Sequence, residues 1–190
     1  MQKEREDILV TICNYLKGNL WFDYQAENKQ ICKICKKHKH INAYNIEKNA
    51  KTILIKLCNC LEIPHKFIRL KVNFDTQFMP NEIGLFKMNS EIGADICILY
   101  SKYFDGYHYA IVLLHELLHY FIRINNFNPI IDEELTVELM MIYLGLGDIM
   151  KEVYKFKILP FKRSLSNNSS FKAGYISAEE ISFCQSIFSR

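Results

Sequence analysis

The sequence predicts an α+β fold, in which a small mixed sheet packs against a buried helix and a second helix follows. Residues 67–73 alternate apolar and polar side chains, as a strand with one buried face does. The short apolar segments 83–88 and 95–100 indicate two more strands. Residues 105–126 and 132–146 are longer apolar stretches interrupted by ionisable side chains, which indicates two largely buried helices.

The rest of the chain has mostly helical patterns. Residues 4–17 and 43–62 place apolar side chains at helical spacing, and Pro64 ends the second of these segments. Ser177 and Glu180 have the spacing of a capping box, which predicts the start of a C-terminal helix. The polar stretch 164–170 predicts a loop. We expect a helical, cysteine-containing N-terminal appendage at 1–42 and a main domain at 43–190.

Composition excludes several classes of protein. A hydrophobic content of 49% predicts a packed core rather than disorder, and a net charge of +3 is too small to predict a nucleic-acid partner. The charged N-terminus and the interrupted apolar runs predict neither a secretory signal nor a membrane partner. Seven cysteines without an export signal indicate reduced thiols and a cytoplasmic location. The oligomeric state cannot be deduced from these features.

The most informative segment is His115-Glu116-Leu-Leu-His119, a His-Glu-x-x-His motif inside an apolar helix. Residues four apart project from the same helix face, so the two imidazoles can share one zinc ion. Glu116 can then act on water as a general base. The alternative is an ordinary core helix with hydrogen-bonded histidines. The cost of burying three such groups among Leu, Ile and Phe favours the metal site.

Two acids at the start of the second helix offer a third ligand. Asp132 can cap this helix, and Glu134 and Glu138 share a face that continues into apolar residues. Like charges on a buried face are unfavourable unless a cation neutralises them. We therefore expect Glu134 to bind the metal and Glu138 to orient a ligating histidine. Glu133 is the alternative ligand if the helix is rotated. Both acids could instead lie in a solvated first turn.

This arrangement resembles the gluzincin metallopeptidases, with a short, minimal connection between His119 and Glu134. The second half of the chain is also similar to small, mostly uncharacterised bacterial His-Glu-x-x-His proteins. The shared features are a Glu-x-x-Thr-x-acid pattern around Glu134, Leu144-Gly-Leu-Gly147, and Gly174-Tyr-Ile-Ser-Ala-Glu-Glu180.

The resemblance implies a zincin-like fold and a zinc-dependent peptidase that cleaves a peptide or one specific protein. It implies zinc held by His115, His119 and Glu134, with Glu116 as general base. Glu138 takes the place of the usual Asp, one methylene shorter. The resemblance identifies no substrate. The alternative function is a non-catalytic zinc-binding scaffold or interaction protein with a structural metal site.

A second set of metal-binding residue types lies nearer the N-terminus. Cys32 and Cys35 have the spacing of half a structural zinc site, and Cys58 and Cys60 could complete it. His38 and His40 are alternative ligands, and Cys58 also fits an apolar helix stripe as a core residue. Lysines within 33–39 could contact phosphates, although a solvated face explains them more simply.

Overall fold

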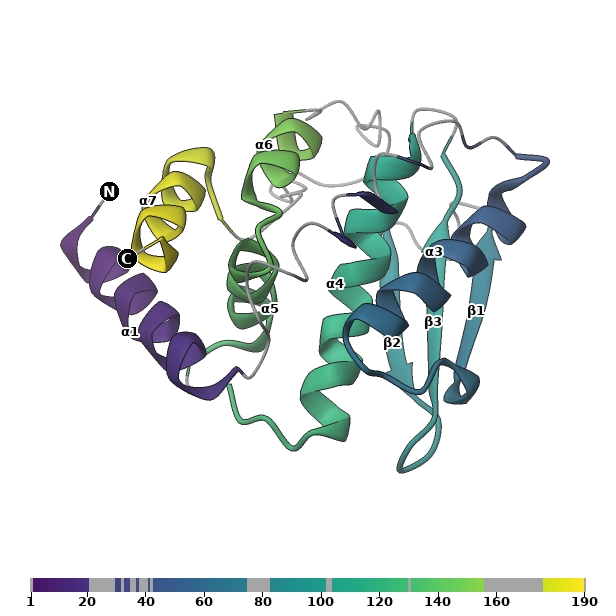
Figure 1. Cartoon of the computed structure of the whole chain (residues 1–190), viewed down its shortest axis with the longest axis horizontal. Helices are drawn as coiled ribbons and strands as arrows, with labels where there is room; N and C mark the ends of the chain where they lie inside the picture. Colours follow the sequence, from purple (N-terminus) through teal and green to yellow (C-terminus); the bar gives the residue numbers. More distant parts are fainter. Residues whose placement is uncertain are drawn as a thin grey trace, which may run out of the picture.

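The computed structural model describes residues 2–20, 30–31, 33–34, 37, 41, 43–74, 83–101, 104–129, 131–155 and 176–189. Over these residues the chain is mixed α+β, with six α-helices and one three-stranded sheet (Figure 1). None of the helices in this part combines the length and apolarity needed to cross a bilayer. In chain order the elements are α1 (Lys3–Asn19), α3 (Ile46–Cys60), a 3-10 helix (His65–Phe67), β1 (Ile68–Asn73), β2 (Gly84–Met88), β3 (Ala94–Leu99), α4 (Gly106–Ile124), α5 (Glu133–Tyr143), α6 (Gly147–Lys155) and α7 (Ala178–Phe188).

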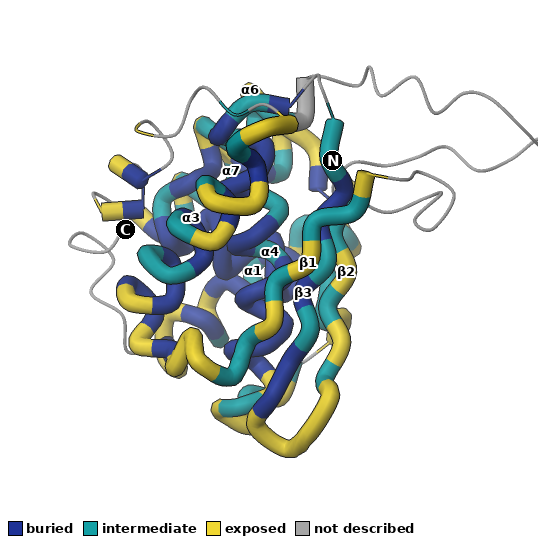
Figure 2. Tube along the Cα trace, turned by 90° about the vertical axis from the view of Figure 1, so that its right-hand side faces the viewer, coloured by how far each residue is buried: buried dark blue, intermediate teal, exposed yellow. Residues whose placement is uncertain are grey.

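The sheet has the strand order β1-β3-β2, which makes β2 an edge strand of the described sheet. β1 runs parallel to β3, and β2 runs antiparallel to it, so the sheet is mixed as predicted. Alternate residues of each strand face the helices, where Ile96 and Ile98 of β3 are fully buried. Figure 2 views the molecule from the side of the sheet, with α4 behind the strands.

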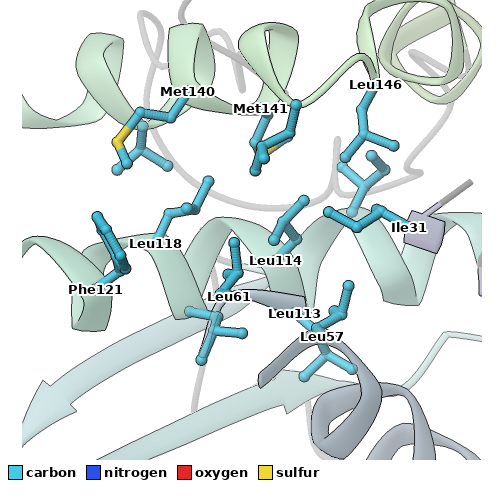
Figure 3. Packing of buried hydrophobic residues seen from close by; sticks show 14 of the residues in the cluster. Ile31, Leu57, Leu61, Leu113, Leu114, Leu118, Phe121, Met140, Met141 and Leu146 are labelled. Carbon is cyan, nitrogen blue, oxygen red and sulfur yellow. The ribbon is translucent and has the colours of Figure 1, made fainter. Parts of the chain in front are cut away.

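α4 is the central element and carries the predicted motif. Leu114 and Leu118 on one side of it point toward Met140 and Met141 of α5 (Figure 3). Leu57 of α3 lies on the other side of α4 in the same cluster. A helix that is apolar almost all round must be covered on most sides, and here the sheet, α3 and α5 cover it. Polar side chains on such a helix therefore face other protein groups.

The N-terminal helix α1 packs against α5 and α7 rather than against the sheet (Figure 1). Its apolar side chains, including Leu9 and Leu16, belong to the same hydrophobic cluster as α4. Arg5 of α1 donates a hydrogen bond to Glu180 of α7 at 2.7 Å. The division at residue 42 stays a prediction, as does the loop at 164–170, which lies outside the described residues.

The ends of α4 agree with the predicted segment 105–126. At its start, the Asp105 side chain accepts hydrogen bonds from the backbone of Tyr107 and His108, and the His108 ring completes a capping box. At its end, Asn126 adopts a left-handed conformation with φ of 50°. The Phe127 N–H then bonds back to the Ile122 carbonyl at 3.0 Å. These caps set where the following chain leaves α4 and approaches α5.

The second predicted helix is shorter than expected. Asp132 caps α5 by accepting a hydrogen bond from Leu135 N–H at 2.7 Å, as predicted. The helix ends at Tyr143 instead of continuing to Leu146, because Gly145 adopts a φ of 79°. Its left-handed backbone turns the chain into α6. The apolar pattern continues without a break to Leu146, so it did not show that α5 ends at Tyr143.

We predict that Gly145→Ala destabilises the fold, because a Cβ in the left-handed region costs about 1–2 kcal/mol. Gly18→Ala is the matched control. Gly18 lies in α1 with no atom within 4 Å of a built Cβ, so alanine there should raise helix stability by roughly 0.5–1 kcal/mol. Urea unfolding monitored by circular dichroism measures both changes. Equal unfolding free energies for Gly145→Ala and wild type would contradict the argument.

Candidate metal centre

The structure brings His115 and His119 of α4 together with Glu134 of α5. The two Nε2 atoms lie 3.2 Å apart. His115 Nε2 is 3.1 Å from Glu134 Oε2, and His119 Nε2 is 3.3 Å from Glu134 Oε1. Both rings therefore present the same nitrogen to one point, and the carboxylate of the neighbouring helix faces that point. These three residues form the one metal-ligand group found among the described residues.

The separations of these atoms fit a zinc ion. Nitrogen and oxygen ligands at about 2.0–2.1 Å in a tetrahedral site lie roughly 3.3–3.4 Å from one another. The observed separations of 3.1, 3.2 and 3.3 Å are close to that edge length. Two imidazoles and one carboxylate are also a donor set that catalytic zinc sites use. The residues present are therefore suited to hold zinc without rearrangement of either helix.

The electrostatics of the group favour an added positive charge. Hydrogen bonding to His115, and then to His119, holds the pKa of the Glu134 carboxyl well below its usual range. Burial alone would lower the pKa of His119, but hydrogen bonds to Glu134 and Glu133 outweigh burial and raise it. The site stabilises either a proton on His119 or a cation that replaces it.

Glu133 contacts the opposite ring nitrogen of His119 from the one that Glu134 contacts. Its Oε1 lies 2.9 Å from Nδ1 of His119, on the far side of the ring from Nε2. Its Oε2 accepts a hydrogen bond of 2.6 Å from Arg123, in the last turn of α4. A carboxylate on the second ring nitrogen fixes the tautomer and orientation of a ligating histidine. Glu133, considered above only as an alternative ligand, therefore orients His119.

Glu138 lies one turn beyond Glu134 on α5 and is 1% exposed. Glu138 is therefore buried as expected, whereas Glu134, in the first turn of α5, has a side chain that is 36% exposed. The predicted hydrogen bond between Glu138 and a ligating histidine stays a prediction. The contact that the structure does provide to the second nitrogen of His119 comes from Glu133.

Glu116 is 7% exposed and lies against the start of the edge strand β2. A Cβ built on Gly84 would come 2.3 Å from Glu116 Oε1 and 2.8 Å from Val112 Cγ1. Only glycine allows the β2 backbone to approach the carboxylate so closely. Two residues along β2, the Phe86 ring stacks on His119, with centroids 6.1 Å apart and an interplanar angle of 10°. β2 therefore borders both Glu116 and the metal ligands.

Three polar side chains near the motif have structural roles. The Tyr109 hydroxyl bonds the backbone of Ser101, and the Tyr120 hydroxyl donates to the Ile92 carbonyl at 2.6 Å. The second contact ties the β2–β3 hairpin to α4. His108 is part of the helix cap. These groups hold the scaffold around the motif.

The described residues include only two of the four cysteines in the predicted second zinc site. Cys32, Cys35, His38 and His40 lie outside the described residues. Cys58 is fully buried in the hydrophobic cluster, and burial raises the pKa of its thiol to about 12. Cys60 donates a weak hydrogen bond to Gln30 at 3.6 Å. Cys58 thus behaves here as a core residue, and the second zinc site stays a prediction.

Sequence reasoning missed Gly84, Phe86 and the contact between Arg123 and Glu133. The sequence could have placed Arg123 on the same side of α4 as the two histidines, because His115, His119 and Arg123 are spaced four residues apart and share one helix face. No comparable signal marks Gly84 and Phe86, whose roles depend on how β2 packs. Comparison with protein-family models, curated proteins and solved structures finds no match to this chain.

We predict a graded loss of zinc across the site. His115→Ala, His119→Ala and Glu134→Ala should each abolish stoichiometric zinc, measured by mass spectrometry of the purified protein. Glu133→Ala should lower zinc affinity about 10–100-fold, because the orienting contact to His119 is lost. Glu133→Gln should lose less, since its amide oxygen still accepts from Nδ1–H. Glu47→Ala, on the first turn of α3, is the control. Unchanged affinity in Glu133→Ala would rule out the orienting role.

Proposed function

We propose that this protein is a zinc-dependent peptidase. The observation that carries the proposal is the convergence of His115, His119 and Glu134, with ligand atoms 3.1–3.3 Å apart. Glu116 is the next residue after His115 on the same helix, and it lies against Gly84 of β2. Three protein ligands are the number that catalytic zinc sites use, because the fourth position then remains open to water or substrate. A structural site usually has four protein ligands, and the described residues bring together three.

Each residue has a distinct role in the proposed reaction. Zinc, when bound, would act as a Lewis acid that acidifies water and polarises the substrate carbonyl. Glu116 accepts a proton from the attacking water and delivers it to the leaving amine. Glu133 keeps His119 oriented so that Nε2 faces the metal position. The buried surroundings of Glu116 exclude bulk water, which strengthens its electrostatic effect on the reacting atoms.

The edge strand β2 offers a way to hold a peptide. Within the described sheet β2 pairs only with β3, so the N–H and C=O groups of its other edge are available for backbone pairing. An extended peptide can add to such an edge as a further strand. Because Gly84 and Phe86 of β2 lie beside Glu116 and His119, a peptide bound there would pass the metal ligands.

We predict that Glu116→Gln retains zinc and the fold but loses peptide cleavage. Removal of a general base typically costs about 10²–10⁴-fold in rate. A peptide library prepared from a bacterial proteome, with cleavage detected by mass spectrometry, provides the assay. Undiminished cleavage by Glu116→Gln would eliminate the mechanism. If the zinc-loaded wild type cleaves nothing and spectroscopy of the cobalt-substituted protein shows four protein ligands, the scaffold function replaces the peptidase.

A further prediction concerns Gly84. Gly84→Ala should retain zinc, because the three atoms nearest to the added Cβ belong to Glu116 and Val112 rather than to a proposed ligand, but it should displace the Glu116 carboxylate. Misplacement of a catalytic group by about 1 Å can cost roughly 10²-fold, so we expect the loss to appear in kcat. Gly18→Ala in α1 introduces the same methyl group far from the site as the control. A wild-type kcat in Gly84→Ala would show that this contact does not position Glu116.

A further inference from the structure

The edge strand β2 presents two exposed side chains on the face of the sheet opposite α4. Gly84, Phe86 and Met88 alternate with Leu85 and Lys87, and Phe86 contacts His119 on the inner face. Leu85 and Lys87 therefore face outward. Leu85 is 44% exposed, and Lys87 is also exposed.

Lys87 carries a positive charge that its neighbours do not neutralise. Its cross-strand partner is Asp95 of β3. Asp95, however, lies within ion-pair distance of Arg69 at 3.7 Å and Lys71 at 3.9 Å, both on β1. Lys87 forms no ion pair with any residue that the structure describes. Three cations share one anion on this face, so its outer surface attracts negative charge.

The position of Lys87 relative to the metal centre follows from the strand geometry. Gly84 lies against Glu116 and Phe86 lies against His119, so the segment 84–86 passes the candidate reaction site. Lys87 is the next residue along the strand. In a peptide paired with β2, the residues opposite Leu85 and Lys87 are two apart, and their side chains point to the outer face. Directly opposite side chains on paired strands have Cβ atoms about 4.5–5.5 Å apart.

We propose that the protein selects extended peptide segments with an acidic side chain opposite Lys87 and an apolar side chain opposite Leu85. This inference rests on the proposed peptidase function and adds the class of substrate. The two selected residues are separated by one residue and lie within a few residues of the bond that is cleaved. Lys87 attracts the acid, and Leu85 buries apolar surface against its partner.

The expected size of the preference follows from the exposure of Lys87. Ion pairs between exposed side chains strengthen binding only modestly, so an acidic residue should bind about two- to fivefold more tightly than a neutral one. Replacing the acid by lysine introduces repulsion and widens the difference. Added salt should reduce it, because exposed charges are screened over about 10 Å at 0.1 M ionic strength.

The test uses zinc-loaded Glu116→Gln protein, which binds without cleaving, and short fluorescein-labelled peptides in a threonine-rich host. One peptide carries Leu-Thr-Glu and another carries Glu-Thr-Leu, so that both strand directions are sampled. Two matched peptides have Lys in place of Glu. Fluorescence anisotropy at low and high salt measures affinity. Lys87→Glu is the test substitution. Lys51→Glu, on the exposed surface of α3 beside β1, makes the same charge change as the control.

The expected result is tighter binding of a Glu peptide than of its Lys counterpart, in at least one order. Lys87→Glu should invert this preference, whereas Lys51→Glu should preserve it. Binding without a charge preference, or a preference that survives Lys87→Glu, would overturn the inference and leave the peptidase proposal intact. No binding of any peptide to the zinc-loaded protein would overturn the inference together with the proposed peptide-binding edge. If the Glu116→Gln protein does not hold zinc, the proposed metal centre is wrong, and both the peptidase proposal and this inference are overturned.

Discussion

The contact between Glu134 of α5 and the two histidines of α4 is the interaction on which the rest of the site depends. All the buried polar side chains among the described residues lie on these two helices. Burying imidazoles and carboxylates between apolar helices is costly unless they pair with each other or with a cation. The 3.1–3.3 Å separations show that the helices meet at the distance that satisfies this requirement. α4 and α5 therefore meet through an apolar interface, and on one side of it through paired histidines and carboxylates.

The second constraint is the attachment of the sheet to α4. The Tyr120 hydroxyl bonds the Ile92 carbonyl in the β2–β3 hairpin, and Phe86 stacks on His119. Gly84 then brings the backbone against Glu116. In the proposed reaction Glu116 moves a proton, and a carboxylate with that role has to lie within a few tenths of an ångström of its working position. Glu116 is fixed by its own helix α4 and by the backbone of β2 that packs against it. A residue on a loop would be positioned less precisely.

The predictable parts of the site are those set by local geometry. His115 and His119 follow from the spacing of a helix, and Glu134 was preferred to Glu133 because it shares a helix face with Glu138. The three strands were also predictable to within one residue at each end, the first from its alternation and the other two as short apolar segments. The orienting role of Glu133 was not, because it depends on where Arg123 of α4 meets α5. The close approach of Gly84 to Glu116 and the end of α5 at Tyr143, before Gly145, were also not predicted. Neither a close backbone approach nor a left-handed turn changes the spacing of the apolar residues.

The contact between the two ends of the chain joins residues much farther apart in the sequence than the contacts of the candidate metal centre do. His115 and Glu134 are 19 residues apart, whereas Arg5 and Glu180 are 175 residues apart. Closing the longer loop costs about 2 kcal/mol more in chain entropy, and such distant contacts form late in folding. The proposed ligands can therefore assemble while α1 and α7 are still apart. A metal ion captured at that stage would act as a template, and the later docking of α1 on α5 would lock the helix that carries Glu134.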